Sequence, residues 1–387
     1  MTVQVQDTGI YNKLMLSAEK IGRLAEEEAL EADLNATISK NVVQLIKEEN
    51  INRLIWPKIY GEPQIDFTTF TDMIKKVGYY NMSASWLTYF YSLHNSWATF
   101  LPKHRMDEIF HADALLADIF APMGKTEKVE GGFIINGKWD FVSGINYSDW
   151  VAVAAIHHFD GEPEPERLGL VVKVSELEII ENWNPLGLRG SGSNSIVIKD
   201  LFIPEDLTFR FNDIPSKKAF NEAIESDYLY YKPSYMSAFF IGFPAVALGG
   251  AERTISEYKK HILNVRRMDG SLKGETPKFQ RVLAEMAINF QAAEALMKEY
   301  ISLLEDKIDE YKPATTQALR AKVIKLCLDI VIKATVTLGA FVAIKGHPIE
   351  MISRDMINLS THMTSLYEDA LENYGKSELG FDVFSLG

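Results

Sequence analysis

The stretch NWNPLGLRGSGSNSIVIKDLFIPED, residues 182–206, joins a tight turn to a strand. Glycine and serine are concentrated between positions 187 and 195, so the backbone there turns sharply or approaches another group closely. The β-branched run that follows predicts a strand. A phosphate-binding loop is not indicated, because the segment lacks the G-x-x-x-x-G-K-[ST] pattern. An ordinary turn between strands remains the simplest interpretation of this segment taken alone.

Short β-rich segments precede this stretch. GGFIINGKWDFVSG, DWVAVAAIHHF and RLGLVVKV are separated by turn signals, which is typical of strands in one sheet. The pair Asn136-Gly137 favours a type I′ turn and predicts a hairpin at that point. We therefore expect a compact antiparallel β-domain over residues 115–227.

Helical patterns flank the β-rich region on both sides. Residues 1–114 are rich in helix formers, and the aromatic segment MSASWLTYFYSLHNSWATFLP predicts a helix buried on most sides. After residue 228 apolar side chains recur every three or four positions over long spans, which predicts a four-helix bundle at 228–387. The predicted fold class is α+β and mostly α, with three domains in that order.

Composition excludes several classes of protein. The 387 residues carry a formal net charge of −13, which argues against nucleic acid as a partner because phosphate binding needs clustered Lys and Arg. The single cysteine, Cys327, excludes a disulfide framework and a cysteine-rich metal site. No run of eighteen apolar residues predicts a membrane span, and the N-terminus has no secretory pattern. We expect a cytoplasmic protein.

The motifs, taken together, resemble one family. VEGGFIINGKWDFVSGINYSDWVAVAA at 129–155 and the 183–206 segment are similar to the two middle-domain signatures of the acyl-CoA dehydrogenase superfamily. ALGGAERTISEY, followed by RRMDG and QRVLAEM, is similar to the helix pair that opens its C-terminal bundle. The resemblance spans nearly the whole chain. It implies an N-terminal helical domain, a middle antiparallel β-barrel domain and a C-terminal four-helix bundle.

The same resemblance implies a bound flavin, either FMN or FAD. A flavin would carry the redox chemistry while the protein supplies position and electrostatics. The turn at 183–193 would then lie near the ring system. The motif positions predict that Ser143 contacts the reacting edge of the ring and that Trp183 flanks it. The other predicted cofactor-binding residues are Trp139, Arg189, Ser193, Arg266 and Gln280, and Arg189 has the alternative of pairing with an acid to hold the turn.

Two branches of the superfamily differ at one segment, HPIEMISRDMINLSTHMTSLYEDALENYGKSELG. Dehydrogenases place a glutamate base after an Arg-Asp pair, but the position aligned with it here is Met363, and Glu368 comes too late. Two-component flavin monooxygenases carry a histidine there instead. His362, eight residues after Arg354, matches that pattern.

We therefore expect the oxygenase component of such a system. It would take reduced flavin from a separate reductase, add O₂ to form a C4a-hydroperoxide and oxygenate a small aromatic or apolar molecule. The predicted catalytic residues are His94, Ser143 and His362, although a lone histidine on a buried helix is also common as a core residue. The alternatives are an acyl-CoA dehydrogenase-like enzyme that uses Glu368, and a non-catalytic family member. The family resemblance also predicts a homotetramer and no bound metal.

Overall fold

The computed structural model describes residues 8–61, 64–159, 161–216, 218, 220–225 and 234–383. Its first part is helical, and three of its helices begin at side-chain caps: Ser39 accepts from the Val42 N–H, Asp66 from the Thr69 N–H, and Asn81 from the Ala84 N–H. Every residue of the aromatic helix α5 is buried, as predicted. The helices of this part are α1 (Thr8–Glu27), α2 (Ala29–Asn35), α3 (Lys40–Glu48), α4 (Phe67–Tyr80), α5 (Met82–Leu93) and α6 (Lys103–His111).

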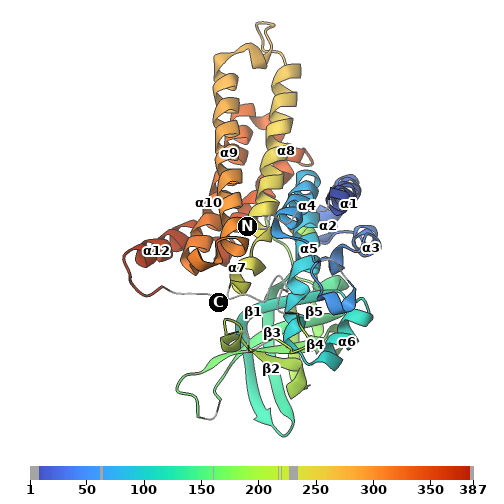
Figure 1. Cartoon of the computed structure of the whole chain (residues 1–387). Coiled ribbons are helices and arrows are strands. Elements are labelled where there is room, and N and C mark those ends of the chain that lie inside the picture. The colour runs from blue at the N-terminus through green and yellow to red at the C-terminus, as the bar shows by residue number, and fades with distance from the viewer. Residues whose placement is uncertain are drawn as a thin grey trace.

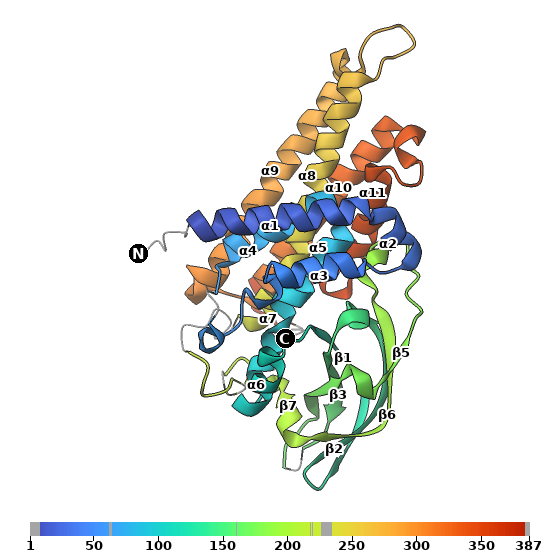
Figure 2. The same cartoon turned by 90° about the vertical axis from the view of Figure 1, so that its right-hand side faces the viewer.

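The middle of the chain forms one sheet of seven strands among the described residues. The hydrogen-bonded order is β5-β6-β2-β1-β3-β4-β7, so β5 and β7 are its edges. Figure 2 shows the sheet curving beneath the helices. The strands are β1 (Leu116–Val129), β2 (Gly132–Val142), β3 (Trp150–His157), β4 (Glu166–Lys173), β5 (Glu178–Ile180), β6 (Asn194–Pro204) and β7 (Thr208–Arg210).

The prediction of an antiparallel barrel was wrong in two respects. β1 and β3 are parallel, and within the described residues the sheet has two edges rather than closing on itself. The parallel pair begins where Asp149 and Leu115 meet. The Leu115 N–H donates to the Asp149 carboxylate at 2.8 Å, and the Asp149 N–H donates back to the Leu115 carbonyl at 2.8 Å. These two bonds hold the starts of β1 and β3 beside each other, pointing the same way.

The predicted hairpin at Asn136-Gly137 was also wrong. β1 and β2 pair down to Val129 and Gly132, so the turn lies at residues 130–131, where Gly131 has φ +76°. Gly137 lies inside β2, at an irregularity in its pairing with β6. A Cβ at Gly137 would come within 2.7 Å of the Trp139 ring. Glycine is needed there for close packing rather than for a turn.

Long helices complete the fold. α8 and α9 form a hairpin that projects away from the sheet, and α10 packs against both of them and against α11 and α12 (Figure 1). α8 approaches α4 closely, because a Cβ at Gly249 would lie 2.4 Å from the Lys75 carbonyl oxygen. The helices are α7 (Tyr235–Phe239), α8 (Gly242–Asn264), α9 (Pro277–Glu305), α10 (Pro313–Leu338), α11 (Pro348–Ser360) and α12 (Tyr367–Glu378).

One segment, Tyr235–Asn264, is long and apolar enough to cross a membrane by length and composition. Of its most apolar window, 89% is buried inside the protein. A core helix passes the same test of length and composition, and the packing of α8 against α4, α9 and α10 explains its apolar character.

Candidate active site

The three residues predicted to be catalytic lie around one side chain, Trp86 on α5. The Trp86 Nε1–H donates to Ser143 Oγ at 3.0 Å. The Trp86 ring centroid lies 5.9 Å from that of His362 and 5.0 Å from that of Phe90, and the Phe90 centroid lies 4.0 Å from that of His94. The fold thus brings together residues from α5 and its end, from the end of β2 and from the α11–α12 connection.

His94 is the centre of a buried hydrogen-bond network and is 1% exposed. Its Nδ1 lies 2.8 Å from Asp118 Oδ2, and its Nε2 lies 2.6 Å from the Tyr89 hydroxyl. That hydroxyl donates its one proton to the Phe239 carbonyl, so its oxygen must accept from Nε2–H. A second proton lies between Nδ1 and Asp118. The histidine and the carboxylate therefore hold two protons between them, and the pair is neutral overall.

His362 has the opposite character. Its Nδ1 accepts from the Thr364 N–H at 3.3 Å and lies 2.9 Å from Thr364 Oγ1. A backbone N–H can only donate, so the proton of the neutral ring is on Nε2. Burial, then the nearby Arg320 and His94, lowers the pKa of His362 to about 4. His362 is thus a neutral hydrogen-bond donor at neutral pH.

The serine-rich turn reaches the same site through its hydroxyls. Ser143 Oγ lies 2.9 Å from Ser193 Oγ, which lies 2.8 Å from Ser191 Oγ. All three side chains are buried. The Gly144 N–H donates to the Ser191 carbonyl at 3.1 Å, which ties the end of β2 to the turn. Ser143 and Ser193, both predicted as cofactor contacts, are therefore direct neighbours.

The turn at 187–193 is held by contacts with α11. The Leu188 N–H donates to Asp355 Oδ1 at 2.6 Å, and Leu188 itself has φ +50°, which is unusual for a residue with a side chain. Gly187 lies against the α11 backbone, because a Cβ there would come within 2.0 Å of the Arg354 carbonyl oxygen. Burial raises the pKa of Asp355 to about 7.

Arginine side chains fasten the same turn to α2. Arg189 Nε donates to the Asp33 carbonyl at 2.6 Å, and Arg354 Nη1 donates to the Asp33 carboxylate at 2.8 Å. Arg354 also pairs with Glu350 at 2.6 Å. The alternative interpretation of Arg189, that it holds the turn, agrees with these contacts. Its role in cofactor binding stays a prediction.

The tryptophans predicted to contact the cofactor lie in different surroundings. Trp183 is partly exposed, and its Nε1–H donates to the Leu188 carbonyl at 3.1 Å, so its ring lies beside the turn. Trp139 is fully buried within the sheet, and its Nε1–H donates to the Ala154 carbonyl at 2.9 Å. The position of Trp139 is that of a core side chain.

Arg266 follows the end of α8 and Gln280 lies in the first turn of α9, so both lie at the tip of the α8–α9 hairpin, which projects away from α5 and the sheet (Figure 1). Arg266 Nη1 donates to the Gly270 carbonyl at 2.6 Å, and Gln280 Nε2 donates to the Gly274 carbonyl at 2.9 Å. Neither reaches the site of its own chain. A cofactor contact from either residue therefore requires a neighbouring subunit.

The site has polar groups that fit a flavin ring. Thr37 Oγ1 and Ser365 Oγ are buried and have no hydrogen-bond partner among the described residues. Thr37 faces the turn, since a Cβ at Gly192 would lie 3.1 Å from its Oγ1. The Ser365 N–H donates to the His362 carbonyl at 2.8 Å, which places Ser365 beside the catalytic candidate. A cofactor with a polar edge would give these hydroxyls the partners that buried polar groups need.

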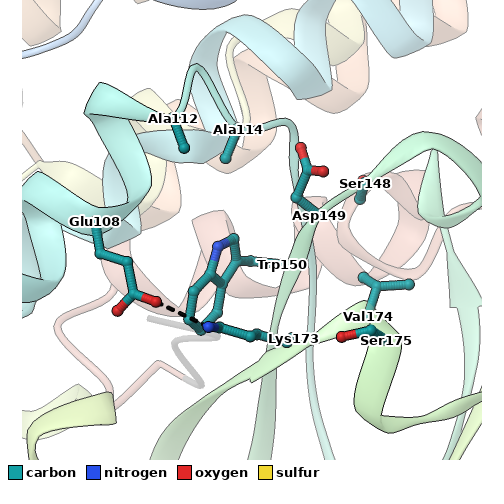
Figure 3. Close-up of a pocket in the computed structure, with 9 residues that line it drawn as sticks. All are labelled: Glu108, Ala112, Ala114, Ser148, Asp149, Trp150, Lys173, Val174 and Ser175. Atoms are coloured by element: carbon teal, nitrogen blue, oxygen red, sulfur yellow. Dashed lines mark ion pairs between the residues drawn. The ribbon is translucent and has the colours of Figure 1, made fainter.

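The open grooves on the surface lie elsewhere. One lies where α6 meets β3 and β4, and it contains Trp150 and an ion pair between Glu108 and Lys173 at 2.9 Å (Figure 3). Another lies between α9 and α10. None of the predicted site residues lines either groove. Within the described residues no cluster of His, Cys, Asp or Glu is suited to a metal ion.

Sequence reasoning missed four residues of the site: Trp86, Tyr89, Asp118 and Arg320. Asp118 is a lone acid in the apolar run ALLADIFAPM, and Arg320 is a cation within the apolar pattern of α10. A charged residue at a position that the periodicity assigns to the core is the signal that each of them carries. Trp86 and Tyr89 had no such signal, because they lie among other aromatic residues.

The chain is similar to several known proteins. Residues 241–365 match the family model described as "Acyl-CoA dehydrogenase, C-terminal domain". The chain is 26% identical to the oxygenase component of p-hydroxyphenylacetate 3-hydroxylase from Acinetobacter baumannii, over 98% of this chain and 91% of that protein. The chain is similar to the oxygenase components of flavin-dependent monooxygenases, and its C-terminal part to the acyl-CoA dehydrogenases.

Other relatives support the same grouping. The flavin-dependent monooxygenase oxygenase subunit HsaA from Rhodococcus jostii is 23% identical over 92% of this chain and 96% of that protein. Among solved structures, XiaF from Streptomyces sp., in complex with FADH2 and glycerol, superposes with a TM-score of 0.90 at 20% identity and covers 100% of this chain and 99% of that one. At that identity the likeness shows the fold. The predicted family resemblance is thus confirmed.

Proposed function

We propose that this protein is the oxygenase component of a two-component flavin-dependent monooxygenase. The observation that carries the proposal is the meeting of His94, Ser143 and His362 around Trp86. The relatives named above are oxygenase components. The partners are then O₂, a separate flavin reductase and a small organic substrate. We infer a homotetramer, as in the superfamily.

Reduced flavin, when bound, supplies O₂ activation and the transfer of one oxygen atom to the substrate. Ser143, Ser193 and Trp183 would hold its ring, and the neutral His362 offers an Nε2–H donor close to Trp86. His94 is fixed by Asp118 at Nδ1 and donates its Nε2–H to the Tyr89 hydroxyl, and an oxygen of the substrate would receive that proton by taking the place of the hydroxyl as acceptor. The enclosure of these groups excludes water, which strengthens each of these hydrogen bonds.

The substrate is a small aromatic or apolar molecule. Phe239 stacks on His94 with ring centroids 3.7 Å apart, and Phe243 lies 4.7 Å from the His362 ring. Phe90 lies 4.0 Å from the His94 ring and stacks on Trp86, whose ring lies 5.9 Å from that of His362. Aromatic walls favour a flat ligand, which they contact face to face or edge to face. The segment at 211–235 is also expected to shape the pocket, and its residues 217, 219 and 226–233 lie outside the described residues.

The dehydrogenase alternative needs a carboxylate base inside the site. Glu368 is exposed at the start of α12, and Met363, at the aligned base position, is 60% exposed. Asp118 is the carboxylate nearest the predicted catalytic residues in the described structure, and it is already bonded to His94. These positions favour oxygenation over dehydrogenation.

The test is an anaerobic titration with reduced FMN and reduced FAD, followed by rapid mixing with O₂. We expect reduced flavin to bind more tightly than oxidised flavin, and a long-lived absorbance distinct from both. Glu368→Gln serves as the discriminating variant, because it leaves this behaviour unchanged if oxygenation is the reaction. Tight binding of oxidised FAD, bleaching by an acyl-CoA and loss of that bleaching in Glu368→Gln would replace the proposal with the dehydrogenase alternative.

A further inference from the structure

Arg320 is a buried cation behind the candidate active site. It lies on α10 and is 4% exposed. Its Nε and Nη2 donate to the Thr364 carbonyl at 3.2 and 2.5 Å, and its guanidinium carbon lies 4.9 Å from the centroid of the Phe240 ring. The Tyr300 hydroxyl also forms a hydrogen bond with it. All of these partners are neutral.

No carboxylate of the described residues forms an ion pair with Arg320. Two partly buried arginines differ in this respect. Arg253 pairs with Glu26 at 2.7 Å, and Arg354 pairs with Asp33 at 2.8 Å. A guanidinium stays charged in proteins, and burying a charge without a counterion costs several kcal/mol. A missing counterion at such a position indicates that an anion binds there.

Arg320 belongs to the electrostatics of the site. It lowers the pKa of His362, and its charge also acts on the Tyr89 hydroxyl, which bonds to His94. The pair of His94 and Asp118 is neutral, and His362 is neutral. Within the described residues the enclosed site therefore carries one positive charge that no acid balances.

We propose that Arg320 binds a carboxylate of the substrate, so that the substrate is a small aromatic carboxylate. The planar guanidinium matches a carboxylate with two parallel hydrogen bonds. The ring of the ligand would then contact the aromatic side chains that link Arg320 to the two histidines. Phe240 contacts the guanidinium and the rings of Phe239 and Phe243, which contact His94 and His362 respectively. This inference rests on the proposed function, because it names the substrate of the same site.

The first test compares two probes of the same shape with the wild-type protein at pH 7: phenylacetate, which is an anion, and phenylacetamide, which is neutral. Binding is measured by isothermal titration calorimetry, without flavin turnover. We expect phenylacetate to bind at least about tenfold more tightly, a factor that corresponds to about 1.4 kcal/mol. Equal affinities, or no saturable binding of phenylacetate, would overturn the proposal.

The second test uses variants. Arg320→Met removes the charge and keeps much of the volume, and we expect it to abolish the preference for phenylacetate. Arg320→Lys should keep part of it. Arg253→Met is the matched control, since it removes another buried arginine of the bundle, and it should keep the full preference. Loss of the preference in Arg253→Met as well would show that general unfolding, rather than Arg320, explains the result.

The two proposals fail separately. If the wild-type protein prefers phenylacetate but shows no long-lived species with reduced flavin and O₂, the carboxylate site stands and the oxygenase proposal falls. If the flavin behaviour is as expected but the two probes bind equally, the protein is an oxygenase whose substrate has no carboxylate.

Discussion

The two histidines of the site differ in the hydrogen bonds that their ring nitrogens make and therefore in the number of ring protons. His94 lies between a carboxylate and the Tyr89 hydroxyl oxygen, which must accept the Nε2–H of the ring. His362 accepts a backbone N–H at Nδ1 and therefore has a single ring proton, at Nε2. The difference is set by neighbouring acceptors and donors and not by the histidines themselves. One residue is therefore suited to hold a proton firmly, and the other to offer a neutral N–H.

Removing the carboxylate behind His94 should destabilise the fold. Asp118→Asn leaves the buried histidine without its charged partner, and breaking such a pair costs about 3–5 kcal/mol. Urea unfolding followed by tryptophan fluorescence measures the change. Asp107→Asn is the control, because Asp107 pairs with Lys103 near the surface and its loss should cost no more than about 1 kcal/mol. A change below about 1 kcal/mol for Asp118→Asn would contradict the assigned network.

His362 should make the protein less stable in acid. Its pKa falls from 6.5 to about 4 in the folded state, so between these pH values the unfolded chain takes up a proton that the folded chain does not. The free energy of unfolding therefore falls as the pH drops from 6.5 to 4, by on the order of 2 kcal/mol from this residue. We expect His362→Gln to flatten that part of the profile. The exposed His158, changed to Gln, should leave the slope as it is.

At the scale of elements, the turn at 187–193 is fixed by two separate segments. α11 provides Asp355 and the backbone that contacts Gly187, and α2 provides Asp33 for Arg189. The turn is thus held by the N-terminal helices and by the C-terminal bundle at once. A displacement of either would move the hydroxyls of Ser191 and Ser193 that reach Ser143.

Gly187→Ala tests this connection. The new Cβ would lie 2.0 Å from a backbone oxygen of α11, which cannot move as a flexible side chain does. We expect a loss of about 1–3 kcal/mol in stability and weaker binding of reduced flavin. Gly375→Ala on α12 meets no atom within 4 Å and should instead stabilise its helix by up to about 1 kcal/mol. Wild-type flavin affinity in Gly187→Ala would show that the turn and α11 are not coupled.

The sequence predicted the elements better than their pairing. The turn, the buried α5 and the long helices follow from local patterns, and Ser143, His94 and His362 followed from motif positions. The parallel pairing of β1 and β3 depends on Asp149 contacting Leu115, and Gly137 was mistaken for a turn because its packing against Trp139 leaves no local sign. Asp118 and His94 are 24 residues apart, at a spacing that belongs to no motif.

At the scale of the whole molecule, the outer faces of α9 and α10 carry exposed apolar side chains. Ile288 on α9 is 63% exposed, and Val336 and Ile332 on α10 are 76% and 37% exposed. Three large apolar side chains on adjacent helices are typical of a surface that is covered by another chain. This agrees with the homotetramer that the family resemblance predicts, and with the position of Arg266 and Gln280 at a tip far from their own site.

A charge on this face should therefore disrupt assembly. We expect the wild-type protein to run as an oligomer in size-exclusion chromatography with light scattering, and Val336→Lys to shift it to smaller species. Leu16→Lys on α1 is the control, since Leu16 is 64% exposed and lies apart from this face. A monomeric wild-type protein would refute the tetramer, and an unchanged mass for Val336→Lys would place the interface elsewhere.

The burial of His94 also has a consequence for the proton NMR spectrum. Protons held between buried partners exchange slowly with water, because exchange requires the surrounding structure to open. Both ring N–H protons of His94 should then persist as separate signals far downfield in the proton spectrum, while those of exposed histidines vanish into the solvent line. Such a signal reports on the closed site directly. Its disappearance on adding a ligand would show that the aromatic side chains packed on His94 have moved.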